Sequence, residues 1–378
     1  MPFGATAPAA LLDELRTVAS DAGLVALGVA PVERFDRTRV DLLDRRERGL
    51  HGGMQFTYRD PDRSTDPSRI LPGARSLVVG ALAYAAGPDP APAFDGPAGR
   101  VARYATRDHY GDLRAALDAV AARLAERGWS TRVVLDDNAL VDRAAAHRAG
   151  IGWWGHNTNV LVPGHGSWVV LGAVVTDAEL PPSTPVDDGC GACRRCLDGC
   201  PTGAIIAPGV IDARRCLAWL VQAEGTFPVE HRVALGDRIY GCDDCQEVCP
   251  PSRRAPAAAR PVEGEAWVDL LEMLGSSDEE LLARFGRWYV PRRDPRHLRR
   301  NAILALGNVA AIGDERVDAA LRVLADSEDE LLAEHATWAL ARIAERAQDG
   351  PGPGHPTDRP VPTDRPVPTD HEGGRTAG

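Results

Sequence analysis

The residues of this 378-residue chain whose types and spacing point most directly to chemistry are its eight cysteines. All of them lie between positions 190 and 249. The first four are separated by two, two and three residues, and a proline follows the last one. This is the pattern that holds 4Fe-4S clusters in bacterial ferredoxins. The run consists of Cys190, Cys193, Cys196 and Cys200.

A second run repeats this pattern without its first cysteine, and Cys216 is the remaining thiol that could supply the missing ligand. The fourth cysteine of each ferredoxin run binds the other cluster. We therefore predict crossed ligand sets. Cluster one would take Cys190, Cys193, Cys196 and Cys249, and cluster two would take Cys200, Cys216, Cys242 and Cys245.

Zinc is the main alternative to iron-sulfur clusters, because Cys-x2-Cys pairs also suit tetrahedral zinc. A zinc site would use two pairs and would leave the third cysteine of each run unexplained. Disulfides are disfavoured because the chain opens without the basic and apolar regions of a secretory signal. We expect a cytoplasmic protein in which two adjacent clusters pass single electrons.

A candidate receiving site precedes the cysteines. Asp136 ends an apolar segment that reads as a strand, and the glycines Gly150, Gly152 and Gly155 follow in a loop that ends at Asn157 and Thr158. Glycines at this spacing allow a backbone to approach a bulky ligand, although a tight turn explains them equally well. Capping of the next helix is the structural alternative for Asp136.

Elements that could position these residues are visible in the apolar pattern. Helices are predicted over 11–23, 112–128 and 140–149, and buried strands over 76–84, 131–135 and 168–175. Alternating helices and strands predict an α/β catalytic domain at residues 1–180. A ferredoxin-like two-cluster domain follows at 181–255.

Helical repeats are predicted beyond the cysteines. Residues 300–308 are echoed 34 positions later, with Ala302 matching Ala336 and Ala305 matching Ala339. This predicts HEAT-like α-helical repeats over residues 256–348, which are too few to stand alone and should pack on the rest of the protein. The proline-rich residues 349–378 read as a disordered tail.

The composition limits the possible partners. The net charge of -11 disfavours nucleic acid in general, but a net charge averages over faces. All basic residues are arginine, because the chain has no lysine. No apolar run reaches the roughly 18 residues of a membrane helix, so we expect no membrane contact.

Taken together, these motifs resemble the epoxyqueuosine reductase family. The resemblance rests on the Asp136 segment, the glycine loop ending at Asn157 and Thr158, both cysteine runs with Cys216, and the terminal repeats. It implies a catalytic fold similar to that of reductive dehalogenases. It also implies that the chain carries out the last step of queuosine synthesis, reducing epoxyqueuosine at the wobble position of tRNA with cobalamin and two 4Fe-4S clusters.

The resemblance also implies roles for individual residues. Asp136 would be the proton donor, although Asp137 beside it could confuse the assignment. His156 stands where the family commonly has lysine, which puts any charge-dependent role there in doubt. The implied cobalamin contacts are Arg63, Asp136, His156, Asn157, Thr158, Ala223, Cys242 and Asp243.

A basic segment offers a tRNA contact. Between positions 284 and 300 there are seven arginines against the single Asp294, with Trp288 and Tyr289 among them. Guanidinium groups can bind phosphates and aromatic rings can stack unpaired bases. An ordinary solvated face is the alternative. The arginines assigned to tRNA are Arg287, Arg292, Arg293, Arg296, Arg299 and Arg300.

The favoured reading is a monomeric tRNA-modifying oxidoreductase supplied by an external low-potential electron donor. Two alternatives remain open at this stage. A cobalamin-dependent reductase of a small molecule would need neither the repeats nor the arginines. A non-enzymatic two-cluster electron carrier would bind no corrinoid and would not depend on Asp136.

Overall fold

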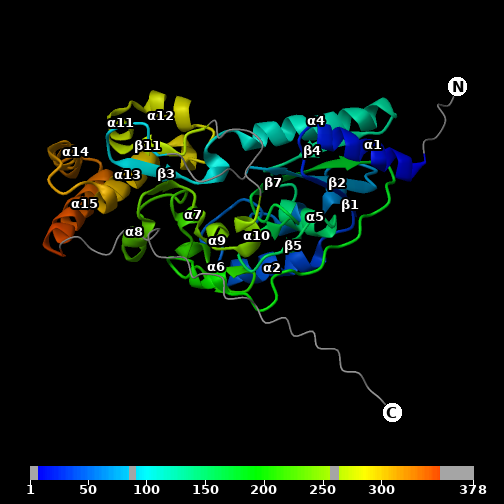
Figure 1. Ribbon diagram of the computed structural model, residues 1–378, viewed down its shortest axis with the longest axis horizontal. Helices are drawn as coiled ribbons and strands as arrows, with labels where there is room; N and C mark the ends of the chain where they lie inside the picture. Colours follow the sequence, from blue (N-terminus) through cyan, green and yellow to red (C-terminus); the bar gives the residue numbers. More distant parts are fainter. Residues whose placement is uncertain (1–6, 85–90, 256–263, 350–378) are drawn as a thin grey trace, which may run out of the picture.

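The computed structural model describes residues 7–84, 91–255 and 264–349. Its largest sheet has four strands in the order β1-β2-β7-β4 (Figure 1). β2 and β7 form its centre as eight-residue apolar runs that are buried along nearly their whole length. Burial on both faces explains why these segments are continuously apolar instead of alternating. The four strands are β1 (Ala26–Pro31), β2 (Ser76–Ala83), β4 (Thr131–Val134) and β7 (Val169–Thr176).

Helices cover both faces of this sheet. Figure 1 shows α1 (Pro8–Asp21) and α4 (His109–Glu126) on one face and α5 (Asp142–Arg148) on the other. The helices and strands predicted in this part of the chain are confirmed to within a few residues. Every pairing in the sheet is antiparallel, however. The α/β alternation therefore builds a layered fold without the parallel strands that such alternation usually indicates.

A second sheet connects the three predicted regions. Its strands are β10 (Arg238–Tyr240), β3 (Ala98–Val101) and β11 (Trp267–Asp269), in that order. β3 precedes the cysteine segment, β10 lies within it and β11 follows it. Strands from all three regions are therefore hydrogen-bonded in one sheet, so the three regions are not separate units along the chain.

Helices dominate the described residues beyond the second sheet. Ala302, Ala305, Ala336 and Ala339 are all fully buried, as expected for positions that repeat along facing helices. Leu304 packs against Phe227 in the cysteine segment, which confirms that these helices are supported by the rest of the protein. The helices are α11 (Leu270–Gly275), α12 (Asp278–Phe285), α13 (Arg296–Val309), α14 (Glu315–Ala325) and α15 (Glu330–Asp349).

Short elements carry most of the remaining functional residues. Within the described ranges, no helix is long and apolar enough to cross a membrane. The predicted disordered tail lies almost entirely outside the described residues. The short elements are α2 (Asp36–Glu47), α3 (Pro61–Ser64), β5 (Trp153–Trp154), β6 (Val160–Leu161), α6 (Arg195–Asp198), β8 (Ile205–Ala207), β9 (Val210–Ile211), α7 (Leu217–Leu220), α8 (Val229–Leu235), α9 (Asp244–Glu247) and α10 (Pro250–Arg253), with single 3-10 turns at Pro67–Arg69, Arg103–Ala105, Ala213–Arg215 and Pro291–Arg293.

Candidate active site

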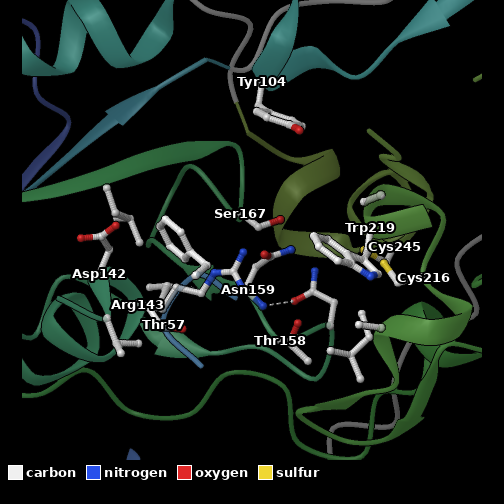
Figure 2. Close-up of a pocket in the computed structure, with 18 of the residues that line it drawn as sticks. Thr57, Tyr104, Asp142, Arg143, Thr158, Asn159, Ser167, Cys216, Trp219 and Cys245 are labelled. Carbon is white, nitrogen blue, oxygen red and sulfur yellow. Dashed lines mark hydrogen bonds between the residues drawn. The ribbon is translucent and has the colours of Figure 1, made fainter. Parts of the chain in front are cut away.

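A large cavity lies between the four-stranded sheet and the cysteine segment, with a volume of about 1480 Å³. Pockets for ordinary small ligands measure roughly 300–1,000 Å³, so this one suits a larger group. Figure 2 shows Asp142 and Arg143 toward one end of the cavity and Cys216 and Cys245 toward the other. The cavity therefore joins the two regions that the sequence singled out.

The eight cysteines form two groups of four. Cys196 and Cys249 interact electrostatically with each other and with Cys190 and Cys193. In the same way, Cys245 interacts with Cys216 and Cys200, and Cys242 interacts with Cys245. These groups match the crossed ligand sets, because Cys249 joins the first run and Cys200 joins the second. The arrangement fits two 4Fe-4S clusters.

Burial sets the protonation state of these thiols before iron binds. It raises the pKa of Cys196 to about 11 and raises the pKa of Cys242 and Cys245 well above the ordinary value. Without iron the buried thiols are therefore neutral at neutral pH. Since thiolate is the form that binds iron, cluster assembly must release protons.

The two groups stand in different relations to the cavity. Cys200, Cys216, Cys242 and Cys245 all line it, whereas the four thiols of the first group do not. Instead, the first group includes Cys190 and Cys193 in a loop whose neighbours Gly191, Ala192 and Arg194 are exposed. The second group therefore borders the cavity, whereas part of the first group lies in an exposed loop.

Asp136 lines the cavity, and Asp137 does not. Asp137 is held in a local turn, where its Oδ1 accepts the backbone N–H of Ala139 at 2.7 Å. Asp136 does not cap the following helix, since that position belongs to Val141 and has no side-chain bond. Asp136 and not Asp137 therefore lines the cavity, and Asp136 is not the cap of the following helix.

The surroundings of Asp136 favour its protonated form. Desolvation by the cavity walls, followed by the charge of Asp137, raises the pKa of its carboxyl. A raised pKa is the property that a general acid needs near neutral pH. The backbone of Asp136 is held at a φ of 47°, a left-handed conformation that costs energy in a residue other than glycine.

The predicted glycine loop ends in the tip of a hairpin. β5 pairs with β6, and the connection carries Asn157 and Thr158 to the cavity wall. Thr158 adopts a φ of 68°, and the buried Asn157 leaves its Nδ2 without a hydrogen-bond partner. A buried amide with no partner costs free energy, and this one belongs to a residue of the cavity wall.

The glycines have a different role from the one expected. A side chain at Gly150 would strike the Thr184 carbonyl oxygen, and one at Gly155 would lie 2.5 Å from Asn157 Oδ1. Neither these two glycines nor Gly152 lines the cavity. They allow the hairpin to pack against the protein itself and not against a ligand.

Four of the predicted cobalamin contacts do not reach the cavity. Arg63 is exposed on the outside of α3. His156 turns toward the cysteine segment, where its Nδ1 lies 2.8 Å from the Cys193 carbonyl oxygen. The carbonyl oxygen of Ala223 accepts a bond from Arg300. None of these residues lines the cavity, and their assignment as cobalamin contacts stays a prediction.

Asp243 is the fourth of these residues. Its Oδ2 accepts the backbone N–H of Arg103 at 2.8 Å, and its Oδ1 accepts Gln246 Nε2 at 3.2 Å. Burial raises its pKa to about 7. The adjacent Asp244 lines the cavity instead of Asp243, and Gln222 lines it instead of Ala223. In contrast, Asp136, Asn157, Thr158 and Cys242 line the cavity as expected.

Arg300 is wrong as a phosphate contact, because it is fully buried. Its guanidinium donates to the carbonyl oxygens of Ala223 at 2.8 Å and Leu220 at 3.1 Å, and also to those of Val221 and Gly225. Burial and the charge of Arg232 lower its pKa to about 10, so it remains a cation at neutral pH. It joins α13 to the loop that follows α7.

Replacing Arg300 with Ala should therefore destabilise the fold by about 3 kcal/mol or more, because several buried carbonyls would lose their donor. The measurement is the midpoint of urea unfolding of the cluster-loaded protein. Arg292→Ala is the matched control, since that side chain is 80% exposed and surface changes usually shift stability by less than about 0.5 kcal/mol. Equal midpoints for the two variants would contradict the structural role of Arg300.

The other predicted arginines differ in availability. Arg296 pairs with Asp294 at 2.6 Å, and Arg299 pairs with Asp278 at 2.5 Å. Arg287 Nη2 donates to the Ala105 carbonyl oxygen at 2.5 Å, and Arg293 Nη1 reaches the Gly286 carbonyl oxygen at 3.4 Å. Among the predicted arginines that form an ion pair, Arg292 has the most exposed side chain. Its partner is the half-exposed Glu224 at 3.0 Å.

The aromatic residues of this segment also divide. Trp288 is buried between Tyr240 and Phe285, with ring centroids 4.5 and 4.6 Å away, so it cannot stack a nucleobase. Tyr289 is 59% exposed and lines the cavity. Its backbone N–H donates to the hydroxyl oxygen of Tyr240 at 2.8 Å, which fixes its place at the rim.

Several cavity residues were missing from the sequence-based site. Asp142 and Arg143 begin α5, six and seven residues after Asp136, and this close sequence spacing could have suggested them. Trp219 and Tyr104 also line the cavity. Trp219 donates from its Nε1 to the Gly52 carbonyl oxygen at 2.8 Å, a contact between distant segments that no local pattern announces.

Comparison with protein families supports both halves of the site. Residues 189–252 match the family model described as a 4Fe-4S double cluster binding domain. Residues 64–137 match the model described as Epoxyqueuosine reductase QueG, DUF1730. The first match contains all eight cysteines and the second ends just after Asp136, so the two motif regions fall in different family models. This decides between zinc and two iron-sulfur clusters in favour of the clusters.

Similarity to individual proteins extends over most of the chain. An epoxyqueuosine reductase from Bacillus cereus is 33% identical over 363 residues, which cover 93% of this chain and 92% of the relative. A crystal structure of epoxyqueuosine reductase with an epoxyqueuosine-modified tRNA-Tyr stem loop has 32% identity and a TM-score of 0.81, covering 88% of this chain and 90% of that one.

A structure of epoxyqueuosine reductase from Bacillus subtilis, with its catalytic loop swung out of the active site, has a TM-score of 0.78 and 32% identity, and the match covers 88% of this chain and 90% of that one. Similarity to a reductive dehalogenase is weak, with a TM-score of 0.43 and 17% identity. The extent of the first three matches and the two cysteine groups beside the Asp136 cavity identify the chain as a member of the epoxyqueuosine reductase family.

Proposed function

We propose that this chain reduces epoxyqueuosine in tRNA to queuosine with electrons relayed through two 4Fe-4S clusters. One observation carries the proposal: a single cavity brings the acid Asp136 together with all four thiols of cluster two. Removing the oxygen of an epoxide requires electrons and protons at the same place. This cavity supplies both, which distinguishes it from the site of a simple electron carrier.

The cavity also fits a cobalamin. Its volume suits a macrocycle, and three buried polar atoms at its wall lack hydrogen-bond partners, namely Asn157 Nδ2, Trp153 Nε1 and Asp142 Oδ1. Thr158, Asn157 and Gln222 would contact the macrocycle on the side of the hairpin and α7. When bound, cobalamin would supply a low-valent cobalt that passes electrons to the epoxide.

The chain's own residues would control the protons. Asp136, whose pKa is raised by desolvation, would donate its proton to the epoxide oxygen as the bond between that oxygen and carbon breaks. Cavity walls that include Trp219 and Tyr240 would keep bulk water from the reacting carbon. Arg143 faces the same space and would favour the negative charge that develops on oxygen.

We infer that the tRNA approaches over Tyr289 and Arg292. Tyr289 is an exposed aromatic at the cavity rim, suited to stack an unpaired anticodon base. Arg292 lies three residues away and could exchange Glu224 for a phosphate. The helices α13 to α15 would support this face as HEAT-like repeats, because their repeated alanines occupy equivalent buried positions.

Arg292→Ala should weaken tRNA binding and reduce the slope of log affinity against log salt by about one, because one phosphate contact is lost. Binding would be measured by titration of labelled tRNA at several salt concentrations. Arg316→Ala is the control, as Arg316 is also exposed and paired with an aspartate but lies on α14, away from the cavity. An unchanged slope in Arg292→Ala would show that this arginine does not contact phosphate.

The decisive experiment on function is anaerobic reconstitution with iron, sulfide and cobalamin, followed by addition of reductant and epoxyqueuosine-containing tRNA. Nucleoside mass spectrometry should detect queuosine. Conversion would exclude the electron carrier, and lack of turnover on small organohalides would exclude the dehalogenase-like alternative. Cluster assembly without cobalamin uptake or queuosine formation would overturn the proposal.

The partners and location follow from this function. The exposed loop around Cys190 and Cys193 would receive electrons from an external low-potential donor. A tRNA substrate and eight iron-binding thiols are consistent with a cytoplasmic enzyme. One chain contains the whole cavity and both cysteine groups, so a monomer would suffice for catalysis.

A further inference from the structure

Asp142 is a buried acid in the cavity that the reaction as described does not use. It is the first residue of α5 and lines the cavity beside Asp136. Its Oδ1 is inaccessible to solvent and has no hydrogen-bond partner. Leaving such an oxygen unpaired costs about 1–3 kcal/mol, so a compensating role in the site is expected.

Burial acts more strongly on the pKa of Asp142 than on that of Asp136. Desolvation, followed by the charge of Asp136, raises its pKa well above the usual range, and the charge of Asp137 acts in the same direction. Arg143 and a backbone hydrogen bond from Asp136 oppose this rise but are smaller. Tyr110 of α4 also faces the pair, and burial raises its pKa, so it remains neutral.

The stoichiometry of the reaction requires a second proton. Conversion of the epoxide into an alkene takes two electrons and two protons, breaks both carbon–oxygen bonds, forms one carbon–carbon double bond and releases water. The clusters supply the electrons in the proposed function. Asp136 carries one exchangeable proton, so it must be protonated again before the oxygen can leave as water.

We propose that Asp142 is the proton reserve of this reaction: it passes its proton to Asp136 after Asp136 has protonated the epoxide oxygen. The inference rests on the proposed function. Asp142 is suited to this role because it lies next to Asp136 inside a cavity that a bound macrocycle and nucleoside would close to water. Its proton returns from solvent after product leaves.

Two substitutions test this role. Asp142→Asn removes the transferable proton while keeping the size of the side chain, and Asp142→Glu restores a carboxyl. With the reconstituted enzyme and epoxyqueuosine-containing tRNA, Asp142→Asn should lower turnover about 10- to 100-fold without changing the KM for tRNA, an effect below that of a direct general acid. Asp142→Glu should recover much of the loss.

The pH profile distinguishes a proton reserve from a structural residue. The wild-type pair should lose its protons in two steps, and turnover should fall at each of them, because the proposed reaction uses both protons. In Asp142→Asn only Asp136 titrates, so turnover should fall in a single step. A merely structural role would reduce turnover equally at every pH.

Infrared difference spectroscopy gives a readout that does not depend on activity. The wild-type holoprotein should show at neutral pH one protonated-carboxyl band that persists in Asp136→Asn and disappears in Asp142→Asn, while the bands of other protonated carboxyls such as Asp243 remain. Absence of this band in the wild type, or wild-type turnover and pH profile in Asp142→Asn, would overturn the role of Asp142. A wild-type enzyme that forms no queuosine would overturn the proposed function instead.

Discussion

Replacing Asp136 with Asn is expected to lower the rate of queuosine formation by about 10²- to 10⁴-fold, the usual contribution of a general acid. Asn keeps the shape of the side chain but cannot donate a carboxyl proton to the epoxide oxygen. Because this substitution leaves all eight cysteines in place, the iron content and reduction of the clusters should not change. Single-turnover conversion of epoxyqueuosine-containing tRNA, with prereduced enzyme, measures this step directly.

Asp137→Asn is the matched control for this experiment. It removes the same charge one residue away, but the side chain lies outside the cavity and its Oδ1 can still accept the Ala139 N–H. We expect a small decrease in rate, because loss of the Asp137 charge slightly lowers the pKa of Asp136. Similar losses in both variants would contradict the assignment of Asp136 as the donor.

The cysteines show which features a sequence reveals well. Ligand spacing within a run is short-range information, since residues two or three apart must bind the same or a neighbouring cluster. The strands β2 and β7 were equally easy to predict from the sequence, because strands buried on both faces contain few polar positions. Both features were therefore predicted with nearly correct bounds.

Residues that depend on side-chain direction were predicted less well. Ala223 and Asp243 miss the cavity by one position, since Gln222 and Asp244 face it instead. Such an offset cannot be read from a motif in a short irregular segment. Periodicity fixes which face a side chain occupies only in a regular helix or strand.

Arg300 was misassigned for a different reason. A sequence gives the number of charges but not their partners, and Arg300 is used to bind buried backbone carbonyls instead of solvent-facing phosphates. Trp288 was misread in the same way, because its ring completes a stack with Tyr240 and Phe285. The antiparallel order of the sheet likewise depends on long-range pairing.

The crossing of the cluster ligands leads to the second large effect. If Cys249 serves cluster one and Cys200 serves cluster two, the double variant Cys190→Ala with Cys249→Ala damages one cluster only. The double variant Cys190→Ala with Cys200→Ala damages both. The uncrossed alternative, in which each run binds its own cluster, predicts the reverse pattern. Both pairs remove two thiols, so each is the control for the other.

We expect the Cys190 and Cys249 pair to retain about four irons per chain and the Cys190 and Cys200 pair to retain almost none, as each cluster holds four irons. Iron and sulfide analysis, with electron paramagnetic resonance of the reduced protein, measures this difference. Both pairs should abolish queuosine formation. Only cluster two would border the cavity. Loss of cluster one would therefore separate cluster two from the exposed loop where electrons are proposed to enter. Direct reduction of the remaining cluster by a small reductant should then restore turnover only in the Cys190 and Cys249 pair. Retention of one cluster by the Cys190 and Cys200 pair would instead establish the uncrossed arrangement.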